Sequence, residues 1–185
     1  NTVVWATRQV TENAGEYTVL HSAISTGGKG KVTLNHSPVY GSILVEADAA
    51  LELGEGSNVE SEADAAITVK GKADLTGCTV RGRQTGLLVT GGKKASATLH
   101  SGEVFGKEAG VLVDGGSFTM DGGTIYGAQC GIHVGGTPKS TVKISGGEIN
   151  ADDTALFAKQ GSSVSLSGGT FTAGQNALAA GESTM

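Results

Sequence analysis

Residues 117–157 decide the fold, because the segment SFTMDGGTIYGAQCGIHVGGTPKS is followed at once by TVKISGGEINADDTALF, which repeats its plan. Each copy has an alternating apolar run, a Gly-Gly turn, a β-branched residue, a polar stretch and a second alternating run. One such unit cannot bury its own apolar side chains, so it is stable only when stacked on further copies. The pattern therefore predicts a solenoid.

Further copies of the unit extend in both directions from this stretch, with a period of about 22 residues. Three apolar anchors recur in each copy, and we expect them to point inward. The first is Leu34, Leu53, Leu75, Leu99, Met120, Ile144 and Leu166. The second is Val39, Val59, Val80, Val104, Ile125, Ile149 and Phe171. The third is a pair: Ile43/Val45, Ile67/Val69, Leu87/Val89, Val111/Val113, Ile132/Val134, Ala155/Phe157 and Ala177/Ala179.

Three short alternating strands per copy, with glycine at the corners, predict an all-β protein: a right-handed parallel β-helix of roughly seven or eight coils. The left-handed form would need a strict six-residue repeat, and a leucine-rich repeat would need an Asn/Cys ladder and a helical segment. The chain lacks both patterns. We expect one domain over residues 1–185, with strands near residues 3–6 and 17–24. Residues 1–30 match the repeat poorly and are expected to form an atypical N-terminal coil or cap. The regular coils of residues 31–185 are expected to continue in a longer natural chain.

Composition excludes several classes of function. A net charge of −5 disfavours a nucleic-acid partner. Only Cys78 and Cys130 are present, without metal-ligand spacing, and they fall at different points of coils about two apart, which disfavours a disulfide. We expect both to be small buried hydrophobic residues. No apolar run is long enough to span a membrane as a helix, so no membrane insertion by this segment is expected.

The middle position of the third anchor pair should face outward, because a one-residue shift exchanges the two faces of a strand. This position holds Leu44, Thr68, Leu88, Leu112, His133, Leu156 and Leu178. One interpretation is that a loop or a neighbouring segment covers this row. The other is a stripe that binds a partner, since contiguous exposed apolar surface is uncommon on soluble monomers. Under the second interpretation Leu88, Leu112, His133, Leu156 and Leu178 contact the partner.

A second outward position follows the second anchor and places Phe105 and Tyr126 on adjacent coils. These rings could support a sugar ring or a protein contact, or they could stack only on each other. Charge forms blocks along the sequence, acidic in residues 46–64 and basic in residues 70–94. Such blocks usually form ion pairs between coils, each contributing little to stability.

No constellation for catalysis or metal binding emerges, so no catalytic residue, metal or cofactor is predicted. Asp152 and Asp153 are the only adjacent acidic pair among the repeats, and successive residues on a strand point opposite ways. The four histidines are scattered and join no Ser-His-Asp or metal-ligand pattern. A carbohydrate-active β-helix that uses Asp152 and Asp153 remains an alternative to a binding module.

The repeats resemble the passenger domains of bacterial autotransporters, particularly the pertactin-like group. The resemblance lies in segments such as AGVLVDGGSFTMDGGTIYG, CGIHVGG and SSVSLSGGTFTAG, and it covers roughly residues 31–180. It implies a secreted or surface-displayed bacterial adhesin or virulence factor that binds a host protein or glycan. We therefore expect a non-enzymatic binding module. A purely structural stalk is the third possibility.

Overall fold

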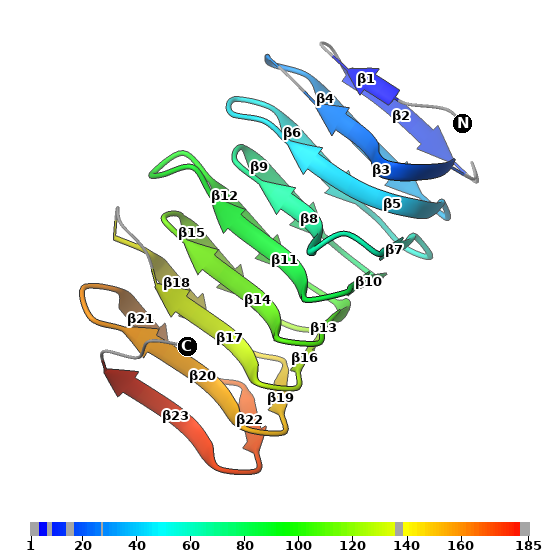
Figure 1. Cartoon of the computed structure of the whole chain (residues 1–185). Helices are drawn as coiled ribbons and strands as arrows, with labels where there is room; N and C mark the ends of the chain where they lie inside the picture. The colour runs from blue at the N-terminus through cyan, green and yellow to red at the C-terminus, as the bar shows by residue number, and fades with distance from the viewer. Residues whose placement is uncertain (1–3, 7–8, 14–16, 27, 136–138, 182–185) are drawn as a thin grey trace.

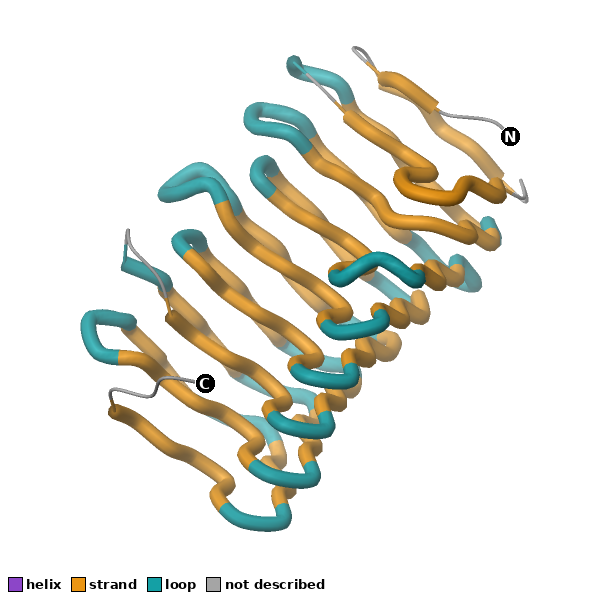
Figure 2. Tube along the Cα trace, in the orientation of Figure 1, coloured by secondary structure: helices purple, strands orange, loops and turns teal. Residues whose placement is uncertain are grey.

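The computed structural model describes the backbone of residues 4–6, 9–13, 17–26, 28–135 and 139–181, and the side chains of residues 28–135 and 139–181. Within these residues the chain forms 23 β-strands and no helix. Accordingly, none of the described residues forms a helix that could cross a membrane. Every strand pair is parallel, and the strands stack in three columns, one strand of each column per coil. Figures 1 and 2 show these columns as the sides of a prism.

The first column is a separate sheet of β2 (Gln9–Asn13), β4 (Lys31–Asn35), β6 (Ala50–Leu53), β9 (Lys72–Leu75), β12 (Ser96–Leu99), β15 (Ser117–Met120), β18 (Thr141–Ile144) and β21 (Ser163–Leu166). The second column contains β7 (Asn58–Ser61), β10 (Cys78–Gly82), β13 (Gly102–Gly106), β16 (Thr124–Gly127), β19 (Glu148–Ala151) and β22 (Thr170–Ala173). The third contains β1 (Val4–Ala6), β8 (Ala65–Val69), β11 (Thr85–Thr90), β14 (Ala109–Asp114), β17 (Cys130–Gly135), β20 (Thr154–Lys159) and β23 (Asn176–Gly181). Two longer strands, β3 (Tyr17–Thr26) and β5 (Pro38–Val45), join the second and third columns.

These columns confirm the predicted fold: a right-handed parallel β-helix of about seven turns, each of roughly 22 residues. The strands expected near residues 3–6 and 17–24 are β1 and β3. In this N-terminal region β2 pairs with β4 and β3 pairs with β5, so the parallel ladders extend into it. The proposed cap and the continuation past residue 185 stay predictions.

The core is a stack of identical anchor positions, because parallel pairing in register places equivalent residues of successive coils over one another. Leu99 pairs with Met120, Val104 with Ile125, and Val111 with Ile132. All six of these side chains are fully buried. The first and second anchors are buried as predicted up to Ile144 and Ile149, and Leu166 is 39% exposed in the last described coil.

The third anchor pair was predicted one residue out of register in the last two coils. Leu156 pairs with the inward Ile132 and is only 3% exposed, so its predicted outward position is wrong. Phe157 instead pairs with the outward His133. Leu178 pairs with Leu156 and so belongs to the inward row, which corrects its predicted outward position as well. Its 53% exposure arises because β23 pairs with β20 alone among the described strands.

Glycine shapes the corner between the first and second columns, as the sequence predicted. Gly147 has a φ of +89°, a region that L side chains rarely adopt. A Cβ atom there would also lie 2.7 Å from the carbonyl oxygen of Gly123 in the coil below. The corner is therefore too tight for any residue but glycine at this position.

Candidate functional site

The outward row of the third column forms what we call the outer ridge: Leu44, Thr68, Leu88, Leu112, His133, Phe157 and Ala179. All seven side chains are half-buried. Register explains this exposure, because each side chain lies directly beside the equivalent one in the next coil. The strands that carry the ridge, from β5 to β23, form the side of the prism nearest the viewer in Figure 1, and no described segment crosses in front of its middle coils.

His133 interrupts the apolar side chains without adding charge at neutral pH. Burial lowers the pKa of this imidazole from its ordinary value, and the charge of Lys159 lowers it further. Its ring meets that of Phe157 edge-on, with centroids 5.4 Å apart. The Nε2 atom is buried and has no hydrogen-bond partner among the described residues. The outer ridge is therefore electrically neutral from Leu88 to Phe157.

The predicted aromatic pair lies on the second column, where Arg81, Phe105 and Tyr126 occupy one outward row. The Arg81 guanidinium lies over the Phe105 ring, 4.4 Å from its centroid. The Phe105 and Tyr126 rings are tilted, with centroids 6.2 Å apart. Tyr126 donates a hydrogen bond of 2.8 Å from its hydroxyl to Asp152 Oδ1, which raises the pKa of the phenol. These contacts favour stacking among side chains over an open platform for a sugar.

The acidic pair Asp152–Asp153 lies at the corner between the second and third columns. Asp152 is exposed and holds Tyr126. The backbone of Asp153 accepts hydrogen bonds from the amides of Gln175 and Asn176 in the next coil. Both residues thus make hydrogen bonds between adjacent coils at this corner.

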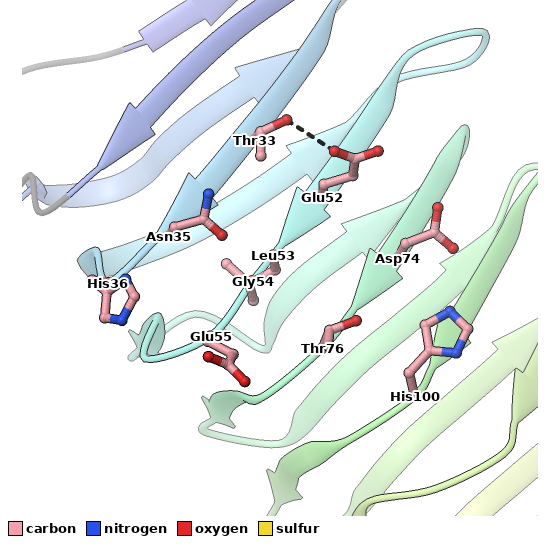
Figure 3. Close-up of a pocket in the computed structure, with 10 residues that line it drawn as sticks. All are labelled: Thr33, Asn35, His36, Glu52, Leu53, Gly54, Glu55, Asp74, Thr76 and His100. Carbon is pink, nitrogen blue, oxygen red and sulfur yellow. Dashed lines mark hydrogen bonds between the residues drawn. The ribbon is translucent and has the colours of Figure 1, made fainter.

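A groove on the first column was not predicted from the sequence (Figure 3). Its volume is about 530 Å³, and it is lined by Thr33, Asn35, His36, Glu52, Leu53, Gly54, Glu55, Asp74, Thr76 and His100. Gly54 opens it, because a Cβ atom at this position would lie 1.9 Å from Asn35 Oδ1. These residues come from four coils, so only the register of the first column could have revealed the groove.

Several polar groups of this groove are held by hydrogen bonds and ion pairs, either with one another or with residues just outside the groove. Lys31 Nζ lies 2.5 Å from Glu52 Oε1, and Thr33 donates a hydrogen bond to the other oxygen; the bond from Lys31 is the main reason that the pKa of Glu52 is lowered. His100 Nδ1 lies 2.9 Å from Asp121 Oδ2. In the part of the chain that the structure describes, no three His, Cys, Asp or Glu side chains are arranged to hold a metal ion.

Both cysteines are free and buried, as predicted. Burial raises the pKa of the Cys78 thiol to about 12 and that of Cys130 to about 11. A thiol reacts as its thiolate, so neither side chain is a nucleophile at neutral pH. They act as small apolar side chains of the core.

Comparison with known proteins adds no relative: no family model, no curated protein and no solved structure matches the chain.

Proposed function

We propose that this chain is a non-enzymatic binding module whose outer ridge contacts a partner protein. The observation that carries the proposal is the row Leu88, Leu112, His133 and Phe157, which places three apolar side chains and one histidine on the outward face of a regular sheet in four successive coils. Apolar surface of this kind marks interaction sites on soluble proteins. A parallel ladder holds the row rigid, which lowers the entropy lost on binding.

The resemblance to bacterial autotransporter passengers supports a location and a type of partner. We propose a secreted or bacterial surface-displayed protein, pertactin-like in its repeats, in which the β-helix acts as an adhesin or virulence factor. A host protein that lays an apolar segment along the outer ridge is the partner that fits this surface. The aromatic pair of Phe105 and Tyr126 is a weaker candidate for a host glycan, since Arg81 covers one face of Phe105.

Replacing both Leu88 and Leu112 with serine tests the role of the outer ridge. Two leucines lost from an apolar contact are expected to cost about 2 kcal/mol of binding free energy, a roughly 30-fold weakening. The measurement is binding of the fluorescently labelled chain to cultured epithelial cells, followed by titration on immobilised extracellular-matrix proteins. The matched control is Tyr40→Ser, which removes an apolar side chain that is 38% exposed but lies on the second column.

Equal binding by the double variant and the control, with unchanged circular dichroism, would rule out the outer ridge. No binding by the unaltered chain would favour a structural stalk. The carbohydrate-active alternative is tested by assaying reducing sugars and unsaturated products on a panel of polysaccharides.

A further inference from the structure

The corner between the third and first columns carries an unusual number of lysines. It consists of the segments that join each third-column strand to the following first-column strand, together with the strand residues that flank these segments. The described parts of these segments run along the upper left of Figure 2. We call this corner the lysine edge, after its cationic residues: Lys29, Lys31, Lys70, Lys72, Lys93, Lys94, Lys139 and Lys159. The same segments contain three acidic residues, Glu46, Asp48 and Asp114.

This edge is basic on a protein that is acidic overall. Eight lysines and three carboxylates leave it with a net charge of +5, whereas the whole chain carries −5. The rest of the chain therefore carries −10. Because exposed charges separated by more than about 10 Å are largely screened at moderate salt, the edge acts locally as a cationic surface.

Much of this positive charge is not neutralised by neighbouring carboxylates. Lys70 pairs with Glu46 at 3.3 Å and Lys94 with Asp48 at 2.9 Å. Glu52, which belongs to the groove of Figure 3, holds Lys31. The other five lysines of the edge have no ion pair within the described residues and are exposed: Lys29, Lys72, Lys93, Lys139 and Lys159.

A hollow in the middle of the edge can receive an anionic group. Its volume is about 420 Å³, and Lys72, Lys93 and Lys94 line it together with Asp48, the hydroxyl-bearing Ser96 and the small residues Ala49, Ala50 and Gly71. Asp48 is engaged by Lys94, which leaves the ammonium groups of Lys72 and Lys93 available to a ligand. Gly71 has no side chain to fill the hollow, and a Cβ atom there would lie 2.3 Å from the Ala49 carbonyl oxygen.

We infer that the lysine edge is a binding site for a linear acidic polysaccharide, one that carries sulfate or carboxylate groups at regular intervals. Such a chain would run along the axis of the β-helix, because lysines recur in five of the coils at steps set by a strand spacing of roughly 4.8 Å. The hollow beside Lys72 and Lys93 would receive one anionic group. This inference uses a different face from the outer ridge and does not depend on the proposed protein partner.

Nucleic acid and anionic membrane fit the edge less well. Single-stranded nucleic acid is usually held by aromatic side chains on which bases stack, and the described segments of this edge contain no aromatic residue. The segments also contain no arginine, the side chain that best recognises phosphate. Membrane-surface binding uses apolar side chains that enter the lipid. The apolar residues between the strands are alanines and Pro138, and the flanking Val45 and Val69 are fully buried.

The test is titration of the whole chain with a size-defined heparin oligosaccharide, which carries sulfate and carboxylate, and with oligogalacturonate, which carries carboxylate only. Isothermal calorimetry at several salt concentrations is the readout. The double variant Lys72→Gln/Lys93→Gln is expected to bind about tenfold or more weakly and to lower the slope of log K against log salt by about two ions. The matched control is Lys107→Gln/Lys143→Gln, which removes the same charge from exposed lysines outside the edge.

Three results would overturn the inference. One is failure of the unaltered chain to bind either oligosaccharide at about 50 mM salt, where such contacts are strong. Another is an equal loss in the two double variants, which would indicate a general charge effect. The third is binding of duplex DNA or of phosphatidylserine vesicles as tight as that of heparin and equally dependent on Lys72 and Lys93. Unchanged circular dichroism and melting temperature in both variants keep the comparison valid.

Discussion

Replacing Leu156 with alanine is expected to lower the free energy of unfolding by about 3 kcal/mol, because the side chain is almost fully buried and leaves a cavity when shortened. Replacing the adjacent Phe157 with alanine is expected to cost only about 1 kcal/mol, since the larger ring is half-exposed on the outer ridge. Urea denaturation followed by far-UV circular dichroism measures both values.

The pair of variants is informative because side-chain size alone predicts the opposite order. If Phe157→Ala is the more destabilising, the third column has the register in which Phe157 points inward. A partner-binding measurement also distinguishes the two variants. Only Phe157→Ala alters the outer ridge while leaving the coil stable.

Gly106→Ala is expected to destabilise the protein by about 3 kcal/mol or more, because the corner of the β-helix between the second and third columns has no room for a methyl group. Gly106 ends β13, and a Cβ atom there would lie 1.9 Å from the Ala109 carbonyl oxygen, a backbone atom that cannot move alone. The adjacent coils repeat this corner with Gly82 and Gly127, which pair with Gly106 on either side. Relieving the clash at position 106 must therefore also distort the paired backbone at Gly82 and Gly127.

The matched control is Gly181→Ala, since a Cβ atom at Gly181 meets no described atom within 4 Å. It should leave the urea midpoint within experimental error. A Gly106 variant as stable as this control would show that the second and third columns are not joined by the tight corner described above.

The repeat allowed most of the fold to be predicted, and one inconsistency explains where the prediction was wrong. Seven residues separate Val104 from Val111 and Ile125 from Ile132, and the same spacing leads from Ile149 to Leu156. Residues 155–158, Ala-Leu-Phe-Ala, fit an alternating strand with either Leu156 or Phe157 pointing inward. Choosing the larger side chain for the core favours Phe157, which is the incorrect register. The spacing from the second anchor was the signal that identifies Leu156 as the inward residue.

The surfaces were harder to predict, because they depend on which coils lie side by side. The acidic and basic blocks of the sequence suggested a separation of charge along the axis. In the structure they occupy neighbouring coils and form the expected ion pairs, such as Arg83 with Asp64 at 2.5 Å and Lys70 with Glu46. The charge separation that remains is perpendicular to the axis of the β-helix, with lysines gathered at the corner between the third and first columns. Neither this corner nor the groove at Gly54 forms a contiguous motif in the sequence.

Thiol labelling tests the central structural claim most directly, that the third column directs Phe157 outward and Leu156 inward. Phe157→Cys and Leu156→Cys are each treated with a maleimide in native buffer, and the rates are compared by mass spectrometry. The two natural thiols give little background, since both are buried and their pKa values are raised. We expect Cys at position 157 to react at a rate close to that of an exposed thiol, and Cys at position 156 to react only after unfolding. Rapid labelling at 156 with protection at 157 would contradict this register and, with it, the outer ridge.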